Sequence, residues 1–142
     1  TWRRSKGVFA NARTVASGCG VHIAWVLHVD EVKNKKGEVV RVMPKLVGSA
    51  QEDTLKCSNV IVYMDRLDYK HVCLDSDGQP VKDEQGLEVL EERTTHRAWV
   101  RCPEDVIPPF ECGTHFEAAL RGPVYYNVVW DDFAKLLQGY IA

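Results

Sequence analysis

A cluster of basic side chains between residues 30 and 46 is the first feature of the sequence that could perform chemistry. Five cations fall within this short stretch: Lys33, Lys35, Lys36, Arg41 and Lys45. Asp30, Glu31 and Glu38 oppose them in part. Such a cluster would neutralise backbone phosphates, so nucleic-acid binding there would be independent of sequence and sensitive to salt. The stretch contains no aromatic side chain on which a base could stack, and lysines around a turn are also common in purely solvated loops.

A histidine and two arginines are further candidates. His28 comes at the end of the apolar segment 21–29, just before a loop, where α/β sheets place residues that contact ligands. Arg97 and Arg101 stand four positions apart on either side of Trp99, so on an extended strand both project to the same face. The alternatives are a histidine bonded to backbone at a strand end and two ordinary strand arginines.

Metal and nucleophile motifs are present only in part. Cys102, Cys112 and His115 contain a ten-residue step between the cysteines and lack a clear fourth ligand, so their spacing does not favour a zinc site. The stretch 75–78 begins like a calcium loop, but its glycine falls too early and no Glu occupies the twelfth place, so we expect a turn. A hydrolase built on Cys112 and His115 is the remaining, distant alternative. The five scattered cysteines suit reduced thiols.

The motif G-x-x-x-x-G-K-S/T occurs nowhere in the sequence, so on its own this chain is not a complete nucleotide-hydrolysing enzyme. Its 142 residues allow one domain, and the formal net charge of -2 favours no class of charged partner. No apolar run approaches the roughly 20 residues that span a bilayer. We therefore expect a cytoplasmic protein without a membrane partner.

The first half of the sequence predicts the elements that position these residues. Apolar side chains at three- and four-residue spacing predict a helix that ends near Gly18 and Gly20. Residues 21–29 and 59–64 are apolar on both alternating faces, which is typical of buried, parallel central strands. Between them, two alternating arms around a Lys-Lys-Gly turn predict a protruding basic hairpin over 30–46.

The second half predicts antiparallel strands and a closing helix. Residues 67–74 alternate loosely and could pair with the preceding strand, and 94–101 forms a further strand. The acidic segment 75–92 predicts a long loop or mobile hairpin. A helix begins near Trp130, with two aspartates in its first turn. The expected fold is α/β, a mixed sheet with two central parallel strands, antiparallel C-terminal strands and flanking helices, in a single domain over 1–142.

This order of elements resembles the C-terminal half of the RecA-type ATPase core, especially phage RecA/RadA-like nucleotide-binding proteins of recombination modules. The resemblance covers residues 1–66 best: the helix that begins Thr1-Trp2, the strand that ends Leu27-His28-Val29-Asp30, the hairpin, and the strand Asn59-Val60-Ile61-Val62-Tyr63-Met64. It continues in Arg97-Ala98-Trp99-Val100-Arg101 and in Trp130-Asp131-Asp132-Phe133. The chain departs from the family by lacking the phosphate loop and the magnesium-holding acidic strand, which lie upstream of this segment in such cores. Together with a first residue that is Thr, this leads us to expect either a trimmed chain or a piece of a longer one.

The resemblance implies roles for the candidate residues. His28 would sense the γ-phosphate, the cations of the 30–46 hairpin would face single-stranded DNA, and Arg101 would reach the nucleotide of a neighbouring subunit in a ring or filament. ATP and Mg²⁺ would be bound mainly by residues outside this chain. The function expected is the C-terminal part of a RecA-like ATP-binding protein in DNA recombination or single-strand handling. The alternative is a non-enzymatic α/β binding or assembly module.

Overall fold

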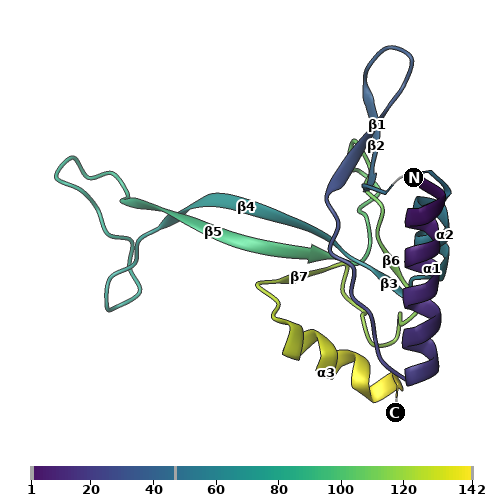
Figure 1. Ribbon diagram of the computed structural model, residues 1–142. Helices are drawn as coiled ribbons and strands as arrows, with labels where there is room; N and C mark the ends of the chain where they lie inside the picture. The colour runs from purple at the N-terminus through teal and green to yellow at the C-terminus, as the bar shows by residue number, and fades with distance from the viewer. Residues whose placement is uncertain (1, 47, 142) are drawn as a thin grey trace.

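The structure, a computed structural model, describes residues 2–46 and 48–141. This part of the chain contains three helices: α1 Trp2–Cys19, α2 Ser49–Cys57 and α3 Trp130–Ile141. Seven strands accompany them: β1 Val29–Lys33, β2 Val39–Pro44, β3 Val60–Ile61, β4 Tyr63–Val72, β5 Leu90–Trp99, β6 Gly113–Thr114 and β7 Val124–Tyr126. Figure 1 shows α1 and α2 side by side at one end, with the long β4–β5 ribbon running away from them. None of the described helices has the length and apolarity that crossing a bilayer requires.

The mixed α/β class is confirmed, but the two central parallel strands are wrong. The strands form three separate antiparallel sheets, β1-β2, β3-β6 and β4-β5-β7. Within the described residues, only the isolated bridge between Val42 and Phe110 is parallel. The segment 59–64 is divided between β3 and β4, which lie in different sheets.

Residues 21–28 are the clearest departure from the prediction. They belong to no strand, and β1 begins only at Val29. Their side chains are largely exposed: Val26 is 97% exposed and Val21 57%. A strand that is apolar on both faces is buried only when neighbouring strands and helices cover it. α1 covers this segment only in part, through Phe9, whose ring centroid lies 4.7 Å from that of Trp25. The segment therefore joins no sheet.

The first helix ends through a local glycine motif. Gly20 has φ +67°, a backbone conformation that only glycine adopts without strain. The N–H of Val21 then donates to the carbonyl of Ala16 at 3.0 Å, and the N–H of Gly20 donates to the carbonyl of Ser17 at 3.4 Å. This is the Schellman arrangement, which satisfies carbonyls at a helix end. Gly20, one of the two glycines that predicted the end of the helix, is therefore its structural cause.

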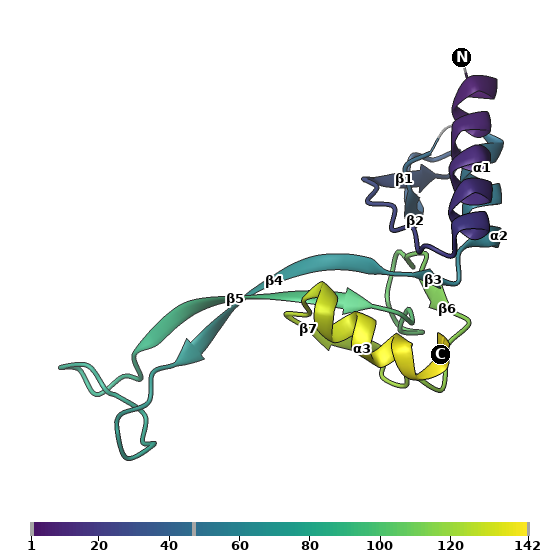
Figure 2. The ribbon, with the colours of Figure 1, turned by 60° about the horizontal axis from the view of Figure 1, so that its bottom comes forward.

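Two hairpins project from the body of the molecule: the β1–β2 hairpin and the β4–β5 ribbon, which we call the arm (Figures 1 and 2). Residues 75–89 of the acidic segment lie at the end of the arm and contain two tight turns, whereas residues 90–92, which were predicted to belong to the loop, are the start of β5. Three turns share one construction, in which an Asn or Asp side-chain oxygen accepts two backbone N–H bonds and a glycine with positive φ follows three residues later. They begin at Asn34, Asp75 and Asp83.

The buried core is small and lies at the base of the arm. Val100, Leu120 and Phe133 are buried together, and partly buried side chains pack around them: Val60, Val62, Ala119, Tyr125, Val128 and Leu137. This cluster brings together the ends of β3 and β5, the turn before residue 121, β7 and α3. The core therefore holds the base of the arm and leaves its outer part without apolar cover.

Candidate nucleic-acid interface

The turn of the β1–β2 hairpin presents two lysines on a rigid backbone. The Asn34 side-chain oxygen accepts bonds from the N–H groups of Lys36 at 2.9 Å and Glu38 at 3.0 Å. Its amide nitrogen donates to the Glu38 carboxylate at 2.7 Å, and Gly37 has φ +83°. Lys35 and Lys36 occupy the two central positions of this turn and are exposed. Their ammonium groups therefore project from a fixed loop at the far end of the hairpin.

The remaining cations of the cluster are less available. Arg41 forms an ion pair with Glu111, and the Lys33 ammonium lies 3.8 Å from the carboxylate of Glu31. Within the described residues, no ion-pair partner is found for Lys35, Lys36 or Lys45. These three lysines are therefore the best candidates for contact with a phosphate backbone.

His28 lies at the base of the same hairpin. Its carbonyl accepts a bond from the backbone N–H of Lys45 at 2.6 Å, so the structure brings these two candidates together. The His28 side chain is exposed. The hairpin thus carries one group of candidates at its turn, Lys35 and Lys36, and another at its base, His28 and Lys45.

The hairpin is anchored to the loop 109–111. The N–H of Val42 donates to the carbonyl of Pro109 at 2.9 Å, and the N–H of Glu111 donates to the carbonyl of Val42 at 2.9 Å. Phe110, between these two positions, stacks on Tyr63 with ring centroids 4.2 Å apart. These contacts fix the base of the hairpin against the base of the arm, so the turn lysines are held at a defined orientation.

The two predicted arginines have separate roles. Arg97 forms two bonds with the carboxylate of Asp65, at 2.8 and 2.6 Å, and its guanidinium lies 5.1 Å from the centre of the Trp99 ring. Arg101 lies beyond the end of β5 and donates to the carbonyls of Arg121 at 3.1 Å and Leu120 at 3.4 Å. Both guanidinium groups are thus engaged within the chain.

The Asp65–Arg97–Trp99 cluster was not predicted. The hydrogen bonds from Arg97 lower the pKa of Asp65, its positive charge and a bond from the Trp99 indole at 3.3 Å act in the same direction, and partial burial opposes them. The same ion pair raises the pKa of Arg97. The signal in the sequence is a cross-strand match: β4 and β5 pair so that Asp65 faces Arg97 and Tyr63 faces Trp99.

Cys112 is a poor candidate for the nucleophile of a hydrolase. Burial, with a contribution from the charge of Cys102, raises the pKa of the Cys112 thiol to about 11, so at neutral pH it is a thiol and a poor nucleophile. No group of three or more His, Cys, Asp or Glu side chains converges as a metal site in the described part of the chain. The sequence also has no phosphate loop for the nucleotide itself.

No protein-family model, no curated protein and no solved structure matches this chain.

Proposed function

We propose that this chain is the C-terminal part of a RecA-like ATP-binding protein that acts in DNA recombination or single-strand DNA handling, and that its β1–β2 hairpin contacts the DNA. The observation that carries the proposal is the rigid turn with Lys35 and Lys36, which are exposed and have no ion-pair partner among the described residues. A protruding, preorganised pair of cations suits a phosphate backbone, because neither lysine must first leave a carboxylate.

The segment 21–28 forms no central strand, and the γ-phosphate sensor proposed for it depends on His28 alone. It is apolar on both faces, extended and largely exposed, and none of its residues belongs to a strand. The His28 carbonyl accepts a bond from the N–H of Lys45, and the exposed His28 side chain would be the γ-phosphate sensor.

Arg101 would act toward the nucleotide of an adjacent subunit. Because its guanidinium donates to the carbonyls of Leu120 and Arg121, this role requires those bonds to break or to be shared when the subunits meet. Bonds from a charged donor are worth about 1.5–3 kcal/mol, which a phosphate in a dry subunit interface can replace.

Binding of a fluorescent oligo(dT) strand, measured by anisotropy at several salt concentrations, tests the DNA contact. The variant Lys35→Glu with Lys36→Glu should bind more weakly, and the slope of log K against log salt should fall by about 0.7 for each phosphate that the variant no longer neutralises. Lys82→Glu with Lys135→Glu is the matched control, since it changes the net charge equally at two exposed positions, at the tip of the arm and on α3. Equal binding by the turn variant and the wild type would refute the assignment.

The second candidate function is a non-enzymatic binding or assembly module. The specific observation in its favour is the shape: a small core from which two long hairpins project (Figures 1 and 2). Such a module explains the missing phosphate loop directly. Titration of oligo(dT) distinguishes the two, because the module has no reason to lose affinity when the turn lysines are reversed.

A further inference from the structure

The arm has an open edge along β4. In its sheet the order is β4-β5-β7, so β4 has a neighbour on one side only. The N–H of Cys73 donates to the carbonyl of Val89 across the ribbon at 2.9 Å. The odd-numbered residues of β4 therefore direct their backbone N–H and C=O groups toward β5. Because hydrogen-bonded and non-hydrogen-bonded positions alternate in an antiparallel ladder, the even-numbered residues direct their backbone groups to the open edge. They are Arg66, Asp68, Lys70 and Val72. Figures 1 and 2 show no other described element along this edge.

An open edge of this length favours association with another strand. It presents a row of unpaired N–H and C=O groups, and a two-stranded ribbon without a core is marginally stable in water. The side chains of Leu67 and Tyr69, on the other face of the pleat from the even-numbered residues, are 37% and 40% exposed. A third and fourth strand would pair the backbone and cover these side chains.

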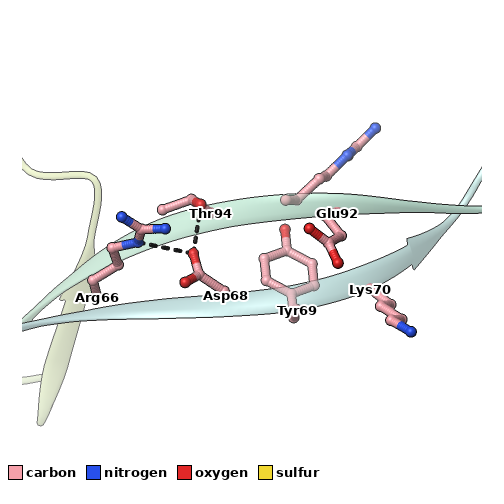
Figure 3. A pocket seen from close by; sticks show the side chains of 7 residues that line it. Arg66, Asp68, Tyr69, Lys70, Glu92 and Thr94 are labelled. Carbon is pink, nitrogen blue, oxygen red and sulfur yellow. Dashed lines mark hydrogen bonds and ion pairs between the residues drawn. The ribbon is translucent and has the colours of Figure 1, made fainter.

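The charges along the edge indicate which strand fits. Asp68 and Lys70 stand on either side of Tyr69 and have opposite charges (Figure 3). The Asp68 carboxylate is held in place by Arg66 at 2.9 Å and by the hydroxyl of Thr94 at 2.6 Å. Lys70 has no ion pair within the described residues. When a second β4 runs antiparallel to the first with Tyr69 opposite Tyr69, each Asp68 therefore lies opposite a Lys70.

We propose that the open edge of β4 binds the same edge of a second copy of this chain, antiparallel and about a two-fold axis at Tyr69. Each Asp68 then faces Lys70 of the second copy, and the two Tyr69 rings meet at the axis. Arg66 faces Val72 and Leu67 faces His71, so no pair of acidic or of lysine and arginine side chains is opposed. The interface is isologous and closes as a dimer, and the two ribbons form one four-stranded sheet.

Other arrangements fit less well. An axis at Asp68 or at Lys70 would place identical charges opposite each other, which destabilises a strand pair. An axis at Leu67 would place no acidic side chain opposite Lys70. It would also place Arg66, which already pairs with Asp68 of its own chain, opposite Asp68 of the second copy. The open edge of β5 is shorter, because Asn127 bonds to His96 there. The N–H of Asn127 donates to the carbonyl of His96 at 2.7 Å, and the N–H of His96 donates to the side-chain oxygen of Asn127 at 3.0 Å. This inference concerns the arm and does not depend on the proposed DNA contact.

Sedimentation over a range of protein concentrations tests the dimer. Lys70→Asp replaces two attractive pairs with two repulsive ones, so the dissociation constant should rise by about tenfold or more. Lys82→Asp, at the tip of the arm, changes the net charge equally away from the edge and should leave dimerisation unchanged. An equimolar mixture of Lys70→Asp and Asp68→Lys chains should recover the dimer. A protein that is monomeric at all concentrations, or a dimer that Lys70→Asp leaves intact, overturns the proposal.

Amide hydrogen exchange gives a second measurement that does not require a variant. On dilution, exchange should accelerate at the edge-facing residues Arg66, Asp68, Lys70 and Val72. The N–H groups of Leu67, Tyr69 and His71 face β5 and should not respond to concentration. Exchange at the edge-facing residues that is independent of concentration would exclude the pairing, as would an equal response of both sets, which indicates folding of the whole arm rather than pairing of its edge.

Discussion

Removal of the Asp65 carboxylate tests whether the base of the arm depends on its charge cluster. Asp65 accepts two bonds from Arg97, at 2.8 and 2.6 Å, and one from the Trp99 indole at 3.3 Å. Asp65→Ala leaves the guanidinium and the indole without this acceptor. Because Asp65 on β4 and Arg97 on β5 connect the two strands at the base of the arm, we expect the substitution to lower the free energy of unfolding of the whole domain.

The magnitude follows from the burial of the pair. The side chains of Asp65 and Arg97 are 24% and 23% exposed, between a surface ion pair, worth at most about 1 kcal/mol, and a buried one, whose disruption costs about 3–5 kcal/mol. We expect a loss of about 2 kcal/mol for Asp65→Ala. With a urea slope of about 2 kcal/mol per molar, the unfolding midpoint should fall by about 1 M.

Urea unfolding followed by tryptophan fluorescence measures this loss, since Trp99 belongs to the cluster. Asp77→Ala is the matched control, because it removes a carboxylate from the exposed tip of the arm, where its side chain forms no hydrogen bond with another described residue. A double-mutant cycle with Arg97→Ala isolates the pair and should give a coupling of about 1–2 kcal/mol. A loss below about 0.5 kcal/mol, or an equal loss in the control, would refute the reasoning.

The pH dependence of the same comparison has a defined sign. The pKa of Asp65 is lowered in the folded state from its ordinary value of 3.8, so its contribution is fully present above that value. As the pH falls through the lower, folded-state pKa, the carboxylate is protonated and the contribution is lost. The difference in stability between the wild type and Asp65→Asn should therefore be constant near neutral pH and shrink in strong acid.

Two further expectations concern the core and the thiols. Leu120→Ala removes a fully buried side chain and should lower the free energy of unfolding by about 2–5 kcal/mol in calorimetry or urea, whereas Leu87→Ala at a 62% exposed position should change it by less than about 0.5 kcal/mol. Cys112, whose pKa is raised to about 11, should react with iodoacetamide at pH 8 much more slowly than the exposed Cys19 and Cys57. Mass spectrometry of the labelled peptides measures the order of reaction. Equal rates would contradict the burial of the Cys112 thiol.

The features that the sequence predicted correctly depend on neighbouring residues. The first helix and its glycine end, and the closing helix with Asp131 and Asp132 in its first turn, follow from periodicity and end signals within a few residues. The turn at Asn34 to Gly37 likewise needs only its own residues. Local chemistry is sufficient for elements of this kind.

The long-range pairings could not be predicted in the same way. Asp65 and Arg97 are 32 residues apart, and the register of β4 with β5 depends on the length and folding of the tip between them. The outer part of the arm has no apolar cover on either face, so there neither strand shows the alternation of apolar and polar residues that reveals a partner. The cross-strand charge match becomes visible only when the pairing is known.

Residues 21–28 belong to no sheet, and β4 has a neighbouring strand on one side only. The side chains of these two segments require different surroundings. The first segment is apolar on both faces, and burying Val21 and Val26 needs a sheet that is covered on each side. The edge of β4 alternates charges, such as Asp68 and Lys70, whose burial under two covering layers would cost more than their pairing returns. The first segment therefore needs an apolar cover on both faces, whereas a second arm in contact with water suits the edge of β4, and the two do not compete for the same backbone.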